Sequence, residues 1–263
     1  FTTVSYEHGS AAYNGFLYVL GGCIAGQCTY TNRTQYTSIS SAGSLEDDSW
    51  STTTAYTTGR RYHTSHVYNG CVYVVGGWTT GSTYFNTVQY ATISASGTVG
   101  AWTTSGNTLT TARREHGSVI YNGFLYVTGG YNGSGINTVE YAAINANCSI
   151  GSFTTSGNTL PNTRFAHGTE AYNGFLYVVG GQGTAANTVQ HAVINSDGSI
   201  GAFSSAGNLP SNRVQLTTNI HNGYLYLVAG CVNSCPPAGG GAYQTAVQYA
   251  PLNSDGTLGS WDT

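Results

Sequence analysis

Short apolar and aromatic runs alternate with glycine-rich turns along the whole chain, and one such run recurs five times. The first copy reads Tyr13-Asn-Gly-Phe-Leu-Tyr-Val-Leu-Gly21-Gly22. The other copies begin at Tyr68, Tyr121, Tyr172 and His221, and the last ends in Ala229-Gly230 instead of Gly-Gly. A period of about 50 residues is typical of solenoids, propellers and other repeat arrays.

Each copy predicts a β-hairpin. Asn-Gly is the strongest short hairpin signal, because both central residues of a type I′ turn need positive φ. In the third copy it joins a strand over 116–121 to the apolar strand Phe124–Thr128. The Gly-Gly pair then ends the strand and allows backbones to approach closely.

The rest of each repeat predicts two more strands. A third strand begins near Asn86-Thr-Val-Gln-Tyr90 in the second copy, and turns such as Asp197-Gly198 lead into a short fourth strand. That strand carries one aromatic residue in each repeat: Trp50, Trp102, Phe153, Phe203 and Trp261. Four strands per repeat, repeated radially, predict an all-β, five-bladed propeller of four-stranded antiparallel blades with almost no helix.

We expect a single domain over 1–263, because all-β domains of this length commonly form one unit. Its repeats span approximately 6–60, 61–113, 114–163, 164–212 and 213–263. Phe1-Thr-Thr resembles the fourth-strand segment Trp102-Thr-Thr, and Trp261-Asp-Thr stands in the same register at the other end. We therefore expect a closed ring in which residues 1–5 lie near the outer strand of the last blade.

The repeated order resembles the kelch repeat over the whole chain: Arg, a strand, Asn-Gly, an apolar-Tyr-apolar strand, Gly-Gly, Val-x-Tyr and Trp. The resemblance implies a propeller, usually with six or seven blades, so five blades would be a departure. It also implies that a repeated arginine ties neighbouring blades together. Four arginines stand at this position: Arg60, Arg113, Arg164 and Arg213.

Charge is scarce. Only 6% of the residues are charged, against about 25% in an ordinary domain. The chain has no lysine and a net charge of −3, which gives a phosphate backbone little to bind, so we expect no nucleic-acid partner. No run approaches the roughly 20 apolar residues of a membrane helix, so no membrane insertion is expected.

Four of the six cysteines form two close pairs, Cys23 with Cys28 and Cys231 with Cys235. A zinc site would require the two pairs to converge, whereas local disulfides require only an oxidising compartment. We expect disulfides, with bends supplied by Gly26 and by Pro236 and Pro237. Cys71 and Cys148 fall on turns of adjacent blades and are compatible with a third bridge. Together with the polar, lysine-free composition, this favours an extracellular or cell-surface protein.

Four histidines share one repeat position: His8, His63, His116 and His167. A ring of imidazoles suggests metal binding. In a radial array of blades, however, side chains of the innermost strand point toward neighbouring blades, so we expect these histidines to form hydrogen bonds between blades. We predict no metal site and no cofactor.

Candidate recognition residues stand where the repeats disagree while their scaffold agrees. These positions lie just before the histidine and just after Gly-Gly, and Arg61 and Arg114 are additional arginines beside them. The predicted ligand-binding residues are Glu7, Arg61, Tyr62, Trp78, Arg114, Glu115, Tyr131 and Gln182. Ring geometry would bring Trp78 and Tyr131 side by side. The alternative is that these residues only pack the loops.

Three functions remain open. The first is a secreted or cell-surface recognition module that binds a glycan or a protein through the variable loops. The second is a structural subunit of an extracellular assembly such as a surface layer, fibre or filament, with copies of itself as partners. The third is a sugar-active enzyme on the same scaffold. No Gly-x-Ser-x-Gly elbow is present, and no catalytic residue is assigned. The acidic run Glu46-Asp47-Asp48 is expected to be solvated.

Overall fold

The described part of the protein is built from β-strands, turns and irregular segments. A computed structural model describes residues 5–24, 26, 28–45, 50–183, 186–232, 235 and 242–263. These residues contain 22 strands and no helix, which confirms the all-β prediction. In this part of the chain no helix is long and apolar enough to cross a membrane.

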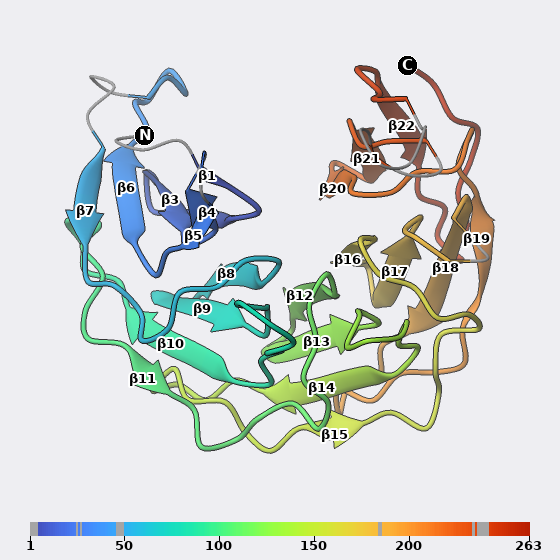
Figure 1. Ribbon diagram of the computed structural model, residues 1–263. Coiled ribbons are helices and arrows are strands. Elements are labelled where there is room, and N and C mark those ends of the chain that lie inside the picture. Colours follow the sequence, from blue (N-terminus) through green and yellow to red (C-terminus); the bar gives the residue numbers. More distant parts are fainter. Residues whose placement is uncertain are drawn as a thin grey trace. The chain divides into compact units, whose positions relative to one another are not determined.

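Each Asn-Gly phrase forms a hairpin of two five-residue strands (Figure 1). The asparagines have φ of 47–48° and the glycines that follow have φ of 76–82°, as a type I′ turn requires. The hairpins are β2 (Gly9–Tyr13) with β3 (Phe16–Leu20), β8 (Thr64–Tyr68) with β9 (Cys71–Val75), β12 (Gly117–Tyr121) with β13 (Phe124–Thr128), β16 (Gly168–Tyr172) with β17 (Phe175–Val179), and β20 (Thr217–His221) with β21 (Tyr224–Val228).

A third strand pairs with the second strand of every hairpin. These third strands are β6 (Thr34–Ser38), β10 (Val88–Thr92), β14 (Val139–Ala143), β18 (Thr188–Val193) and β22 (Val247–Pro251). Four sheets have a fourth, outer strand: β7 (Ser51–Thr53), β11 (Thr103–Thr104), β15 (Thr154–Thr155) and β19 (Ser204–Asn208). In the last sheet an isolated bridge between Tyr249 and Asp262 stands in that place. The predicted antiparallel order of the strands is confirmed.

The described residues form six sheets, one more than the five repeats predict. The additional sheet consists of β1 (Ser5–Tyr6), β4 (Cys23–Ile24) and β5 (Thr29–Tyr30). Because β1 precedes β2 and β4 follows β3, this sheet extends the first hairpin beyond Glu7 and Gly21-Gly22. At the equivalent place the second and fifth repeats show only isolated bridges, Arg61–Trp78 with Trp78–Tyr84 and Val214–Cys231 with Cys231–Tyr243. In the first repeat Cys23 and Ile24 both pair on each side, with Ser5–Tyr6 and with Thr29–Tyr30, so the same segments form short strands.

The chain divides into two compact units. The first contains residues 1–114 and 143–153, and the second contains residues 115–142 and 154–263. Tyr18, Leu20 and Val72 are fully buried in the core of the first unit, as are Leu176 and Leu225 in that of the second. Residues 1–5 were expected to lie near the outer strand of the last blade. Residues 1–4 lie outside the described residues, and Ser5 pairs with Ile24 of the first repeat.

Repeated polar side chains link the sheets within each unit. His63 Nε2 lies 3.1 Å from the Leu20 carbonyl oxygen of the preceding repeat. His167 Nε2 lies 2.9 Å from Thr128 Oγ1, again of the preceding repeat. For these two histidines the predicted hydrogen bond between repeats is confirmed. Burial lowers the pKa of His63 to about 3, so the imidazole is neutral at physiological pH.

Three of the repeated arginines share one contact. Arg60, Arg164 and Arg213 are almost fully buried. Their Nη1 atoms donate to the carbonyls of Gly76, Gly180 and Ala229, at distances of 2.9, 3.2 and 3.0 Å. Each bond joins the segment that enters a sheet to the end of that sheet's second strand. The arginines therefore hold together the two chain segments from which the variable loops begin.

All six cysteines are paired. The local disulfides Cys23–Cys28 and Cys231–Cys235 confirm the prediction. Because these four cysteines are bonded in pairs, they do not form the alternative zinc site. Gly26 has φ of 99° and supplies the expected bend, whereas Pro236 and Pro237 lie outside the described residues. Cys71–Cys148 joins the second repeat to the third. Three disulfides indicate an oxidising compartment.

Candidate functional site

Two backbone pairs position the loops of the second repeat. The Arg61 N–H donates to the Trp78 carbonyl at 3.0 Å, and the Trp78 N–H donates to the Arg61 carbonyl at 2.9 Å. Trp78 also bridges to Tyr84 across its own loop. Side chains from this small frame and from its neighbours gather in the first unit. We call them the aromatic–arginine cluster: Tyr30, Arg61, Tyr62, Trp78, Tyr84 and Arg114.

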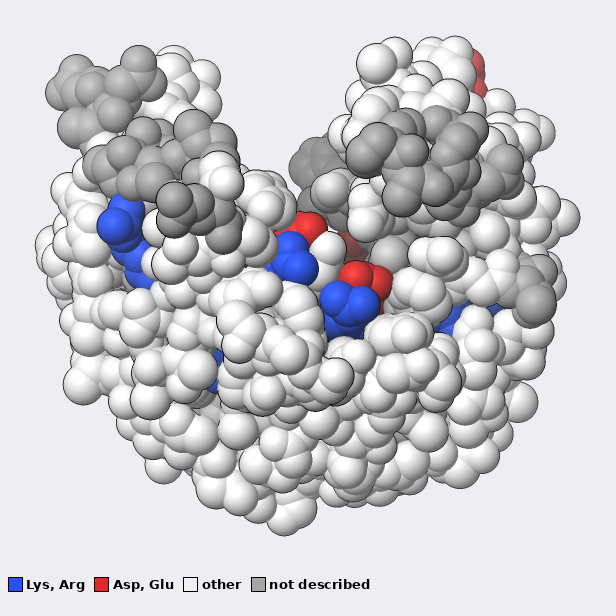
Figure 2. All heavy atoms as spheres, viewed as in Figure 1, with Lys and Arg blue, Asp and Glu red and all other residues white. Residues whose placement is uncertain are grey.

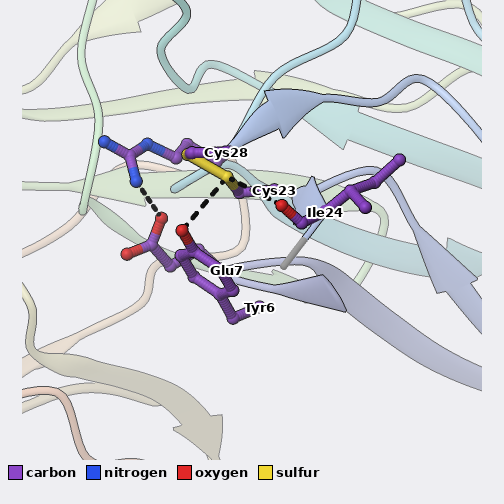
Figure 3. Close-up of polar contacts among 6 residues, drawn as sticks. Tyr6, Glu7, Cys23, Ile24 and Cys28 are labelled. Atoms are coloured by element: carbon purple, nitrogen blue, oxygen red, sulfur yellow. Dashed lines mark hydrogen bonds and ion pairs between the residues drawn. A yellow bond between two sulfur atoms is a disulfide. The ribbon is translucent and has the colours of Figure 1, made fainter. Parts of the chain in front are cut away.

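Arg61 is the centre of the cluster. Its guanidinium carbon lies 4.7 Å from the ring centroid of Trp78, 4.8 Å from that of Tyr62 and 5.4 Å from that of Tyr30. Its Nη1 forms an ion pair of 2.7 Å with Glu7 Oε2 (Figure 3). The two side chains are 17% and 22% exposed, so the pair borders solvent and contributes little to stability.

Arg114 contacts the same two rings from the next repeat. Its guanidinium carbon lies 5.2 Å from the centroids of both Tyr62 and Trp78, and 5.9 Å from that of Tyr84. Tyr30 adds an edge-to-face contact with Trp78 at 5.6 Å. Cation–π contacts of this kind contribute about 0.5–1 kcal/mol each at exposed sites. Together they hold the rings in a fixed arrangement.

The Cys23–Cys28 disulfide supports one side of the cluster. It closes the β4–β5 hairpin, which carries Tyr30 at its end. Cys23 Sγ lies 3.3 Å from the hydroxyl of Tyr6, the residue that precedes Glu7 (Figure 3). The short bridge therefore stiffens the segment from which both Glu7 and Tyr30 reach Arg61.

The residue just before the histidine position, which Leu216 fills in the fifth repeat, has a left-handed backbone in every repeat. These residues, which we call the ladder positions, are Glu7 (φ 58°), Tyr62 (55°), Glu115 (51°), Ala166 (53°) and Gln215 (51°). In the first unit the Tyr62 N–H donates to the Glu7 carbonyl at 3.2 Å. In the second unit Ala166 donates to Glu115 at 2.8 Å and Gln215 to Ala166 at 3.0 Å. One backbone hydrogen bond thus joins each such pair of neighbouring repeats.

The second unit brings a different set together. The rings of Tyr131 and Phe165 lie 5.1 Å apart. Phe165 and Gln182 are joined by two backbone hydrogen bonds of 3.3 and 2.7 Å. Phe165 thus contacts Tyr131 through its ring and Gln182 through its backbone, and the next residue, Ala166, donates to the Glu115 carbonyl. Trp78 and Tyr131 belong to different units, and their side-by-side placement stays a prediction.

Five of the predicted residues are therefore gathered in the first unit: Glu7, Arg61, Tyr62, Trp78 and Arg114. Sequence reasoning missed Tyr30, Tyr84 and Phe165. A signal for the tyrosines was present, because Tyr30, Tyr84 and Tyr243 each stand four residues before the third strand of their repeat. Phe165 stands at the same repeat position as Arg61 and Arg114. Those two arginines were interpreted as additional charges, so the position that all three residues share was not recognised.

The cluster offers recognition chemistry. Two guanidinium groups, one carboxylate and several aromatic rings give it directional hydrogen bonding beside flat apolar faces. Charge is sparse on the face shown in Figure 2, where most of the surface carries neither acidic nor basic side chains. Within the described ranges no three His, Cys, Asp or Glu side chains gather as a metal site would require.

The comparisons agree with this fold. Residues 59–90, which include Arg61, Tyr62, Trp78 and Tyr84, match the Kelch motif. The solved structure titled "Structure of YjhT" is similar, with a TM-score of 0.73 and 15% sequence identity over 98% of this chain and 83% of the YjhT chain. At that identity the likeness shows the fold alone. A search of curated proteins found no match.

Proposed function

We propose that this chain, which belongs to the kelch-repeat proteins, is a secreted or cell-surface recognition module that binds a glycan or protein ligand through the aromatic–arginine cluster. We further propose that its repeats form one closed domain over 1–263 with five blades, the sixth sheet being an extension of the first repeat. The kelch fold is a common scaffold for protein binding, and the three disulfides favour an extracellular location.

One observation carries the proposal. Arg61 and Arg114, from successive repeats, both lie against Tyr62 and Trp78. These four residues are only partly buried, so part of each side chain is accessible from solvent. Trp, Tyr and Arg dominate the energetic centres of interfaces. Residues that served only to pack a loop would not need two guanidinium groups in so weakly charged a chain.

The test compares two tryptophans. Trp78→Ala removes a ring of the cluster, whereas Trp102→Ala removes a ring that lies just before β11, packs against Tyr56 and donates its indole N–H to the Thr54 carbonyl. Both variants and the wild type are applied to an array of oligosaccharides and used as bait for secreted proteins. Trp78→Ala should cost about 2 kcal/mol or more of binding, and Trp102→Ala should cost none. Equal binding by Trp78→Ala and the wild type would contradict the proposal.

A structural subunit is the second candidate, and the last sheet favours it. Val228 and Val247 pair on β21 and β22 and are 36% and 48% exposed. Their counterparts in the second repeat, Val75 and Val88, are fully buried. An apolar sheet face of this kind gains about 25 cal/mol per Å² when covered, and a second copy of the chain would cover it.

Sedimentation of the wild type over a range of concentrations tests this candidate. Association that disappears in Val247→Glu would support packing through the last sheet. The same substitution on an exposed outer position, Thr104→Glu, serves as the control. A monomer at every concentration would remove the candidate.

A further inference from the structure

Two sets of residues in this chain adopt the same unusual backbone conformation. The first set is the asparagine of each Asn-Gly turn: Asn14, Asn69, Asn122, Asn173 and Asn222, with φ of 47–48°. The second set is the five ladder positions, with φ of 51–58°. Both sets recur once per repeat, so a left-handed backbone occurs at ten residues, five in the hairpin turns and five at the ladder positions.

The residues chosen at the two places differ completely. A left-handed backbone costs an ordinary residue about 1 kcal/mol or more, while glycine adopts it readily and asparagine is the commonest alternative. All five turns use asparagine. No ladder position uses asparagine or glycine, and the residues there are Glu7, Tyr62, Glu115, Ala166 and Gln215.

Folding alone does not explain that choice. The ladder hydrogen bonds, such as Tyr62 N–H to the Glu7 carbonyl and Gln215 N–H to the Ala166 carbonyl, involve only backbone atoms. Glycine or asparagine would make the same bonds with less strain. None of the ladder side chains is fully buried, so core packing does not require them either. Strain that a simple substitution would remove is a mark of functional positions.

We propose that Glu7 and Tyr62 are specificity-determining residues of the aromatic–arginine cluster, retained at a cost in stability because their side chains contact a hydroxyl-rich glycan. This inference rests on the proposed function and assigns its ligand class. A carboxylate and a phenol read hydroxyl groups through hydrogen bonds, and both stand against the guanidinium of Arg61, beside the indole of Trp78. The indole supplies the flat face on which a sugar ring packs.

The cost in stability is measured at Gln215, whose side chain is exposed. Gln215→Gly should raise the melting temperature by about 2 °C, because it relieves the left-handed strain in a domain of this size. Asn222→Gly in the same repeat is the matched control and should change it little, since asparagine already tolerates this backbone. A melting temperature for Gln215→Gly that does not exceed that of the control would overturn the claim of strain.

Binding is measured on an array of neutral and acidic oligosaccharides. Tyr62→Asn keeps a residue suited to the backbone but removes the phenol, and should lower the array signal at least tenfold. Asn69→Gly, in the same repeat but in the hairpin turn, should leave the signal unchanged.

Three other outcomes are decisive. If Tyr62→Asn binds like the wild type while Trp78→Ala does not, the inference fails and the proposed recognition function stands. If neither variant loses binding, both fail. If the wild type binds no oligosaccharide, the glycan assignment is wrong, whatever the melting temperatures show.

Discussion

At the scale of single residues, a carboxyl group buried between two repeats is the clearest source of pH dependence. Glu170 lies on β16, accepts a hydrogen bond of 2.8 Å from Thr218 Oγ1 of the next repeat, and pairs across the hairpin with Tyr177. Burial raises the pKa of Glu170 to about 7, outweighing the hydrogen bond from Thr218, which lowers it. The folded protein therefore favours the protonated carboxyl.

The sign of the effect follows from this shift. Below pH 4.5, the ordinary pKa of the group, Glu170 is protonated in both states and costs nothing. As the pH rises toward 7, the unfolded chain ionises first, so folding loses on the order of 2 kcal/mol. Glu170→Gln should be more stable than the wild type above pH 7 and equal to it near pH 4. Denaturant unfolding at several pH values measures the difference, and a constant difference across that range would contradict the assignment.

Two histidines make the protein less stable at low pH, whereas Glu170 makes it less stable at high pH. Burial lowers the pKa of His63 to about 3 and that of His66 to about 4. Above pH 6.5, the ordinary pKa of histidine, both imidazoles are neutral in the folded and unfolded states and cost no stability. As the pH falls toward the folded pKa values, the unfolded chain binds protons first, so the free energy of unfolding decreases. His66→Gln should reduce the loss of stability between pH 6.5 and pH 4 by about 2 kcal/mol relative to the wild type. Acid titration followed by circular dichroism tests this, and unchanged acid sensitivity would count against it.

At the scale of strands, the start of each inner strand packs closely against the next repeat. A Cβ placed on Gly168 of β16 would lie 2.5 Å from Thr218 Oγ1 and Cγ2 on β20. Because both groups belong to packed strands, Gly168→Ala should destabilise the protein by about 1–3 kcal/mol. A Cβ on Gly157 would meet no atom within 4 Å, so Gly157→Ala is the matched control and should stay within about 0.5 kcal/mol of the wild type. Equal melting temperatures for the two variants would argue against this packing.

The Cys71–Cys148 disulfide joins the start of β9 to a turn of the following repeat. The bridged cysteines are 77 residues apart, and a loop of that length gives about 4 kcal/mol in the chain-entropy account. Replacing both cysteines with alanine should lower the free energy of unfolding by about 2–4 kcal/mol. The Cys231–Cys235 pair, four residues apart, should cost less when replaced in the same way. An equal loss for both pairs would show that loop length does not decide their effect.

At the scale of the whole chain, the repeat made the strands predictable. Asn-Gly, Gly-Gly and the recurring Val-x-Tyr specify local geometry through backbone rules, so the hairpins and third strands were found within a few residues. The β1–β4–β5 sheet was not predicted, because it is formed by the variable segment after Gly-Gly, which the repeat pattern does not describe. The ion pair between Glu7 and Arg61, 54 residues apart, depends on how two repeats pack, which the repeat pattern alone does not specify.

Only part of the candidate site could be predicted from the sequence, for a related reason. Positions where the repeats disagree identified Trp78 and Tyr62, whereas Tyr30 stands at a position where three repeats agree, with Tyr84 and Tyr243, and so was not identified. The ladder backbone was also hidden in the sequence, because positive φ is normally inferred from glycine or asparagine and neither occurs there.

Hydrogen–deuterium exchange with and without an oligosaccharide that binds on the array tests the central claim most directly, because it reports where a ligand lies. The account predicts slower exchange in peptides that cover residues 5–7, 28–31, 61–62 and 78–84, which belong to the aromatic–arginine cluster and its supports. It predicts no change at the outer strands Ser51–Thr53 and Thr103–Thr104. Protection confined to those outer strands, with none at the cluster, would contradict it.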